Sequence, residues 1–101
     1  MLIRRTDPVQ RRRRCTYFNK FLEKHGVSFL TAAAIFLNEI VERVDDREDY
    51  GELRFIALGR VDAEIYRVVF TWRGETVIRI VSAQRASKHE QEIYYRAVFA
   101  E

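Results

Sequence analysis

The side chains best suited to chemistry in this sequence are several arginines and one Lys-His pair. Lys24 and His25 come directly before Gly26, a residue typical of helix ends, where the helix dipole favours a cationic imidazole. Guanidinium groups bind phosphate oxygens through several N–H donors, and a histidine can move a proton near neutral pH. The arginines of interest stand in or beside predicted strands, at Arg54, Arg60, Arg79 and Arg85.

Each of these residues also has a structural interpretation. A histidine at a helix C-terminus often only caps the last carbonyl groups, and arginines at strand ends are often solvated charges, which we expect of Arg67 and Arg73. Arg54 and Arg60 would lie about 20 Å apart along an extended strand, so they cannot hold the same phosphate. Their spacing suits a polymer with several phosphates better than a small anion.

Three strands are predicted to position the arginines, over residues 53–59, 65–73 and 76–83. Their connections are short, so the strands should pair antiparallel in sequence order. Ser87 and Glu90 have the spacing of a capping box, which predicts a helix from about Lys88 to Phe99. The acidic stretch from Asn38 to Gly51 breaks the pattern and is predicted to be a loop or a short edge segment.

Two helices are predicted ahead of the sheet. Asp7-Pro8 suits an N-cap and a first helical position, so one helix would run from Pro8 to His25; the alternative is a disordered basic arm with a helix only from Thr16. Ser28 would cap a second helix, from Phe29 to about Leu37. Its apolar stripe comprises Phe29, Ala32, Ala33, Phe36 and Leu37. The predicted fold class is α+β, with two N-terminal helices packed on a mainly antiparallel sheet and a C-terminal helix.

The alternation of side chains along strands predicts which arginines share a face of the sheet. With simple hairpins, Arg54 and Arg60 lie on one face together with Ile78 and Ile80. The other face then carries Arg79 and Arg85. A one-residue slip or a bulge would move Arg79 across the sheet.

Composition limits the class of protein. The chain has 101 residues, 48% of them hydrophobic, which predicts a single domain with one core over residues 1–101. No apolar run approaches the roughly 20 residues that span a bilayer, so no membrane association is expected. Cys15 is the only cysteine, which suits a reducing cytoplasm, and no His, Cys or carboxylate spacing predicts a metal or cofactor site. His89 is expected at the surface.

Charge is unevenly distributed, although the net charge is only +3. Residues 1–25 carry eight lysines and arginines against two acids, and residues 39–52 carry seven acids against two arginines. A basic element and an acidic segment in one small chain indicate a polyanionic partner, a basic protein partner, or both.

Four segments of the sequence stand out together. They are Lys24-His25-Gly26-Val27-Ser28-Phe29, Arg54-Phe55-Ile56-Ala57-Leu58-Gly59-Arg60, Arg79-Ile80-Val81-Ser82-Ala83-Gln84-Arg85-Ala86, and Glu90 through Tyr94-Tyr95. In this order and spacing they resemble the BrnT family of bacterial toxins, over roughly residues 18–96. Residues 1–17 form a divergent basic element, although Asp7-Pro8 is similar to the family's start.

The resemblance implies a fold similar to RelE-type ribonucleases and a cytoplasmic type II toxin that cuts RNA and inhibits translation. It also implies a BrnA-type antitoxin, a DNA-binding repressor, as partner. A homodimer and a toxin–antitoxin heterotetramer both remain open.

The resemblance and the side-chain chemistry together assign roles for metal-independent cleavage, in which the 2′-hydroxyl attacks the neighbouring phosphate. His25 would act as general acid or base, and the phosphate charge would be stabilised by Arg60, Arg79 and Arg85. Lys24 and Arg54 would position the RNA backbone. Tyr94 or Tyr95 would stack on a base, while core packing is expected for at least one of them.

Two other hypotheses remain open on the sequence. The divergent N-terminus suits a degenerate toxin that no longer cuts and acts as an RNA- or antitoxin-binding module. The four consecutive arginines of residues 11–14 suit a DNA-binding accessory protein, which would bind duplex DNA with a steep dependence on salt.

Overall fold

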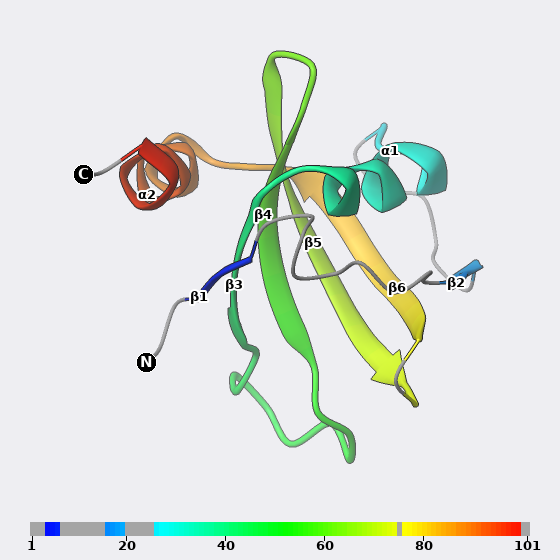
Figure 1. Ribbon diagram of the computed structural model, residues 1–101. Helices are drawn as coiled ribbons and strands as arrows, with labels where there is room; N and C mark the ends of the chain where they lie inside the picture. The colour runs from blue at the N-terminus through cyan, green and yellow to red at the C-terminus, as the bar shows by residue number, and fades with distance from the viewer. Residues whose placement is uncertain (1–3, 7–15, 20–25, 75, 100–101) are drawn as a thin grey trace.

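A six-stranded sheet, seen in a computed structural model, forms the framework of the protein (Figure 1). The structure describes the backbone of residues 4–6 and 16–19, and residues 26–74 and 76–99 in full. The order of the strands in the sheet is β1-β3-β4-β5-β6-β2. Every pairing is antiparallel except that between β2 and β6. The strands are β1 (Arg4–Thr6), β2 (Thr16–Asn19), β3 (Ile40–Val44), β4 (Phe55–Val61), β5 (Glu64–Arg73) and β6 (Val77–Arg85).

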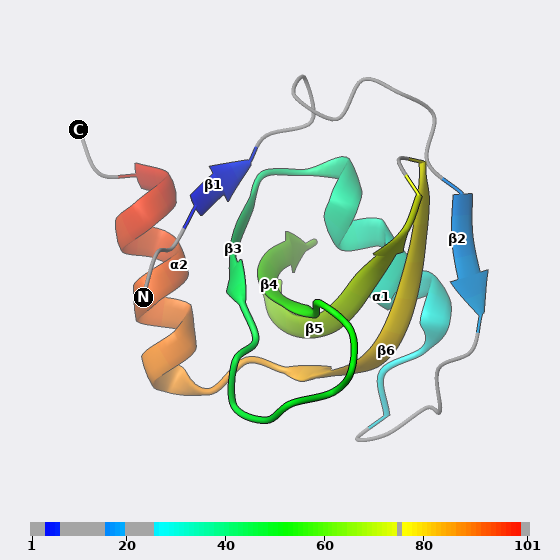
Figure 2. The same cartoon turned by 90° about the horizontal axis from the view of Figure 1, so that it is seen from below.

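The sheet curves around a short helical segment on its concave side (Figure 2). This segment is α1 (Phe29–Ala34), continued by a 3-10 turn, η2 (Ile35–Leu37). Ser28 caps α1, because its Oγ accepts a hydrogen bond from the Thr31 N–H at 3.2 Å. We call the concave side of the sheet the α1 face. Apolar side chains of every second strand residue meet α1 there, and Phe70 lies at the centre, 5.0 Å from Phe36 between ring centroids.

Gly59 brings β4 and η2 into close contact. A Cβ atom at this position would lie 2.5 Å from the Cβ of Ile35, far inside van der Waals contact. Both atoms are fixed by backbone, so neither can rotate away. Glycine is therefore required here for the sheet to close around η2.

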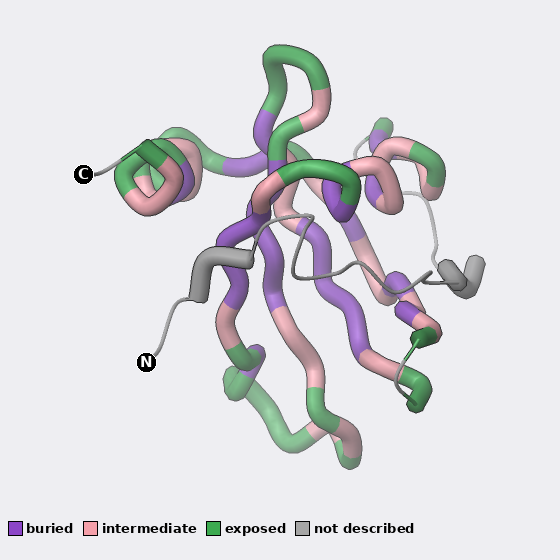
Figure 3. Tube along the Cα trace, viewed as in Figure 1, coloured by how far each residue is buried: buried purple, intermediate pink, exposed green. Residues whose placement is uncertain are grey.

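The second helix, α2 (Lys88–Phe99), packs on the other side of β3 and β4, which we call the α2 face. Its start is fixed by the expected capping box: the Ser87 N–H donates to Glu90 Oε1 at 2.8 Å, and the Glu90 N–H donates to Ser87 Oγ at 3.2 Å. A smaller apolar cluster joins α2 to the sheet, formed by Val41, Leu58, Ile65, Ala86 and Tyr94. Figure 3 shows buried residues along the middle of the strands and exposed residues at the connections.

Several predictions are confirmed. The α+β class, the C-terminal helix and the antiparallel order of the three predicted strands are present, and β5 and α2 match their predicted bounds closely. The helix after Ser28 begins as predicted but changes to a 3-10 turn at Ile35. The predicted apolar stripe of this helix is wrong at Leu37, which is 71% exposed. The tighter 3-10 turn rotates Leu37 away from the core.

The prediction of a helix from Pro8 to His25 is wrong at Thr16–Asn19, which form β2 beside β6, and so is the alternative of a helix from Thr16. The other residues of that segment lie outside those described. Asn38–Gly51 was also misjudged, because Ile40–Val44 form a paired inner strand, β3. β3 pairs with β1 on its outer side, and the local sequence of residues 38–51 does not reveal this partner.

Candidate nucleic-acid interface

A bulge in β6 decides which arginines share a face. The register passes from Val69 opposite Ser82 to Phe70 opposite Ile80, so Val81 is an extra residue. Side chains alternate along a strand, and one extra residue therefore reverses the faces beyond it. Simple hairpins predicted the faces of Arg54, Arg60 and Arg85 correctly. They were wrong beyond the bulge, because Ile78 and Ile80 are fully buried on the α1 face and Arg79 lies on the α2 face.

The bulge brings Arg79 beside Arg54, with one carboxylate between them. Arg54 Nε lies 3.0 Å from Glu52 Oε2, and Arg79 Nη1 lies 3.7 Å from Glu52 Oε1. The guanidinium carbon of Arg54 also lies 4.2 Å from the ring centroid of Tyr50, within the range of a cation–π contact. The pKa of Glu52 is lowered, first by the hydrogen bond from Arg54 and then by the positive charges of Arg54, Arg79 and Arg73. We call Arg54, Arg73 and Arg79 the arginine cluster.

Arg60 and Arg85 lie at the opposite end of the strands. Arg60 is six residues from Arg54 on β4, about 20 Å away at the usual rise per residue. Arg60 is exposed and its Nε donates to the Asp62 carbonyl oxygen at 2.7 Å, while Arg85 is the exposed last residue of β6. The register pairs Arg60 with Ile65 and Arg85 with Tyr66, so the two side chains leave opposite faces of the sheet. The four arginines thus form two groups, one at each end of the strands, and the second group is split between the two faces of the sheet.

The tyrosine pair of α2 divides into a buried and an exposed ring. Tyr94 is 3% exposed, and its hydroxyl donates to the Glu39 carbonyl oxygen at 3.0 Å, which ties α2 to the start of β3. Tyr95 is 38% exposed and stacks on Phe99 at 5.8 Å between centroids. Tyr94 therefore packs in the core, and the ring with open surface for a base belongs to Tyr95.

Lys24 and His25 lie outside the described residues, as do the four arginines of residues 11–14. Gly26, directly after His25, is described and has a φ of 74°. This left-handed conformation is the one expected of Gly26. The next residue, Val27, is buried in the α1-face core.

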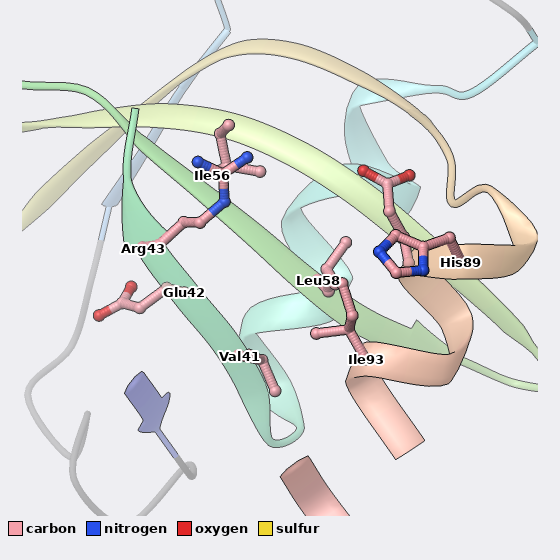
Figure 4. A pocket seen from close by; sticks show the side chains of 8 residues that line it. Val41, Glu42, Arg43, Ile56, Leu58, His89 and Ile93 are labelled. Atoms are coloured by element: carbon pink, nitrogen blue, oxygen red, sulfur yellow. The ribbon is translucent and has the colours of Figure 1, made fainter. Parts of the chain in front are cut away.

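Sequence reasoning missed a pocket of about 230 Å³ on the α2 face (Figure 4). Its walls come from β3, β4 and the first turns of α2; apolar side chains form the floor, and Arg43, His89 and Glu90 stand at the rim. His89 is exposed, as predicted, but its position at a pocket depends on how α2 packs, which no local pattern encodes. Arg67, beside this region, lies 3.2 Å from Glu90 through its Nε and holds α2 to β5.

The α2 face carries side chains of the type that binds polyanions. It carries the arginine cluster at one end, Arg43 and the pocket near its middle, and Arg60 at the far end. Within the described residues, no three His, Cys, Asp or Glu side chains gather as a metal site would require. No helix in the described part of the chain is long and apolar enough to cross a membrane.

Arginines spread along one face of a small curved sheet are typical of proteins that bind the phosphate backbone of nucleic acids. Comparison with known families agrees: the model of the family described as ribonuclease toxin, BrnT, of type II toxin–antitoxin systems matches residues 18–90. The chain belongs to this family of ribonuclease toxins, which implies a protein antitoxin as partner. No curated protein and no solved structure matches the chain significantly.

Proposed function

We propose that this protein cuts RNA without a metal ion and inhibits translation in the cytoplasm, and that a BrnA-type antitoxin, a DNA-binding repressor, controls it. The observation that carries the proposal is the series of arginines along the α2 face, from the arginine cluster to Arg60, in a member of a ribonuclease toxin family. The distance between Arg54 and Arg60 spans several phosphates of an extended RNA strand, and a strand that contacts both has to cross α2, which packs on Leu58 between them.

The proposed reaction begins when the 2′-hydroxyl attacks the adjacent phosphorus. The P–O5′ bond breaks, leaving a 2′,3′-cyclic phosphate and a 5′-hydroxyl. His25 takes the proton from the 2′-hydroxyl or gives one to the leaving O5′, and water exchanges the other proton. Arginines stabilise the extra negative charge on the phosphate. We assign Arg60, on the α2 face, to the reacting phosphate, together with His25. Arg85 leaves the opposite face at the same end of the strands, so its assignment to that phosphate requires the phosphate to lie beyond the strand ends, where both side chains can reach it. Arg79 was also expected at the reacting phosphate, but it lies at the other end of the strands from Arg60. We therefore assign Arg79, with Arg54 and Lys24, to a neighbouring phosphate.

Cleavage of a labelled single-stranded RNA in the presence of EDTA tests the proposal. The wild-type protein should produce fragments ending in a 2′,3′-cyclic phosphate. His25→Ala and Arg85→Ala should lower kcat by about a hundredfold or more, as expected when a proton-transfer group or a charge-stabilising group is lost. Arg96→Ala, which removes an exposed arginine on α2, is the matched control and should cut normally.

The two groups of arginines should also differ kinetically. Arg54→Ala and Arg79→Ala should mainly raise KM, because uniform binding of the backbone is lost, whereas Arg60→Ala should mainly lower kcat. The assignment is wrong if His25→Ala and Arg85→Ala both cut RNA at the wild-type rate. Cleavage that depends on added Mg²⁺ would refute the metal-independent mechanism. Induced expression should arrest growth, and co-expression of the antitoxin should relieve it.

A further inference from the structure

Glu52 occupies the position in which the arginine cluster would hold an anion. One carboxylate oxygen of Glu52 faces Arg54, which lies in the β3–β4 connection directly before β4. The other oxygen faces Arg79 on β6. Arg73, at the end of β5, adds a third positive charge that acts on the same carboxylate. One negative charge therefore faces three positive charges.

Among the described residues, the contacts with Glu52 leave most of the guanidinium donors of the arginine cluster without a hydrogen bond. Each guanidinium carries five N–H groups, and a well-fitted carboxylate accepts two parallel bonds from one arginine. Glu52 instead makes one 3.0 Å contact with Arg54 and one 3.7 Å contact with Arg79, and the second is too long for a hydrogen bond. Two non-bridging oxygens of a phosphodiester, which also carries one negative charge, can approach the same donors from solvent.

The segment that carries Glu52 allows it to leave. Glu52 stands between Gly51, whose φ is 71°, and Leu53, whose carbonyl oxygen accepts a hydrogen bond from Thr71 Oγ1 at 2.7 Å. The backbone is therefore held, and the side chain alone has to rotate. Figure 3 shows that the β3–β4 connection is exposed over most of its length. The side chains of Glu52, Arg54 and Arg79 are each about a quarter exposed, so solvent can replace the broken contacts.

We propose that Arg54, Arg73 and Arg79 form a phosphodiester-binding subsite in which Glu52 acts as a built-in competitor that RNA must displace. The inference rests on the proposed function for the identity of the ligand, a single-stranded RNA. Such a competitor makes binding of one isolated phosphate weak. A polymer that also contacts arginines farther along the α2 face can still displace the carboxylate, and the subsite therefore favours long substrates over mononucleotides.

Binding of an uncleavable oligonucleotide tests the inference separately from cleavage. The probe is a fluorescein-labelled 12-nucleotide RNA in which every 2′-hydroxyl is methylated, and its Kd is measured by fluorescence anisotropy. Glu52→Gln should bind about fivefold more tightly than wild type, a change consistent with the loss of two partly exposed ion pairs. Glu48→Gln removes the same charge from an exposed position of the same connection and should change Kd less than twofold.

A double variant locates the effect at the cluster. In Glu52→Gln/Arg54→Ala, compared with Arg54→Ala, most of the gain from Glu52→Gln should disappear, because the arginine that is hydrogen-bonded to Glu52 is absent. The slope of log Kd against log salt should be similar for Glu52→Gln and wild type, since the same phosphates are contacted once Glu52 has been displaced, whereas Arg79→Ala should lower it. Glu52→Asp, whose shorter side chain keeps the charge but reaches the arginines less well, should show a smaller gain and serves if Glu52→Gln does not fold.

The outcomes separate the two proposals. Equal affinities for Glu52→Gln and Glu48→Gln, or weaker binding by Glu52→Gln, would overturn the competitor role even if unmodified RNA is still cut. Absence of cleavage by the wild-type protein would refute the nuclease proposal and leave the comparison of Kd values intact. Failure of every variant to bind the oligonucleotide would overturn the subsite itself.

Discussion

Lowering the pH should reduce the stability of the folded protein by protonating Asp45. The Asp45 side chain is fully buried, and Arg47 holds it bidentately, with Nε 2.7 Å from Oδ1 and Nη2 2.7 Å from Oδ2. The hydrogen bonds from the Arg47 side chain are the main cause that lowers the pKa of Asp45 from 3.8 to about 2; burial opposes them, and the Arg47 backbone N–H adds to them. The carboxylate therefore stabilises the folded state whenever it is ionised.

The size and direction of the effect follow from this pKa. A shift from 3.8 to about 2 corresponds to about 2.4 kcal/mol at 1.36 kcal/mol per pKa unit, and solvent around the half-exposed Arg47 reduces this to about 1–2 kcal/mol. Because the folded-state pKa is the lower one, the contribution is complete above about pH 4. It declines as the pH falls from there toward 2.

Urea denaturation at pH 6, 4, 3 and 2.5 measures the effect. At pH 6 Asp45→Asn should be less stable than wild type by about 1–3 kcal/mol, because buried charge-assisted hydrogen bonds are lost. The difference between the two proteins should shrink by about two thirds of the Asp45 contribution, about 1 kcal/mol, toward pH 2.5. Asp46→Asn, an exposed neighbour, should cost less than about 0.5 kcal/mol at pH 6. A difference between wild type and Asp45→Asn that stays constant over this range would refute the reasoning.

Three further substitutions test the packing that positions the α2 face. Gly59→Ala should cost about 2–3 kcal/mol in urea denaturation, because its Cβ would overlap Ile35; a loss below 0.5 kcal/mol would mean that β4 can shift freely. Tyr94→Phe should cost about 1 kcal/mol through the lost hydrogen bond to the Glu39 carbonyl, and an unchanged unfolding midpoint would argue against that bond. Ser87→Ala should lower stability by about 1 kcal/mol and reduce helical circular dichroism, whereas Ser87→Thr should retain both.

The predictable parts of the fold are those with local signals. The capping box of Ser87 and Glu90 and the alternation in β5 identify their elements from a few neighbouring residues. β2 and β3 carry no comparable signal, because partners far away in the chain stabilise them as strands: β2 pairs with β6, and β3 lies between β1 and β4. Tertiary pairing overrides local propensity in both places.

The candidate site was predictable in its residue types but not in its grouping. Arg54 and Arg79 could be selected as phosphate ligands, yet the bulge at Val81 decides that they meet, and Val81 lies in a run of β-branched residues without a glycine to mark it. Glu52 is one of several acids in its segment, and only the three-dimensional path of the β3–β4 connection distinguishes it from the others.

Both outer strands of the sheet come from the beginning of the chain. The inner strands β3 to β6 are successive neighbours and can pair through short loops, but Thr6 pairs with Ile40 and Thr16 with Val77. Closing such long loops is entropically costly and slows folding. During synthesis the segment of β2 is made long before its partner β6. Until β6 has been made, that segment can pair with a strand of another chain, so a nascent toxin is open to early capture by a partner or to aggregation.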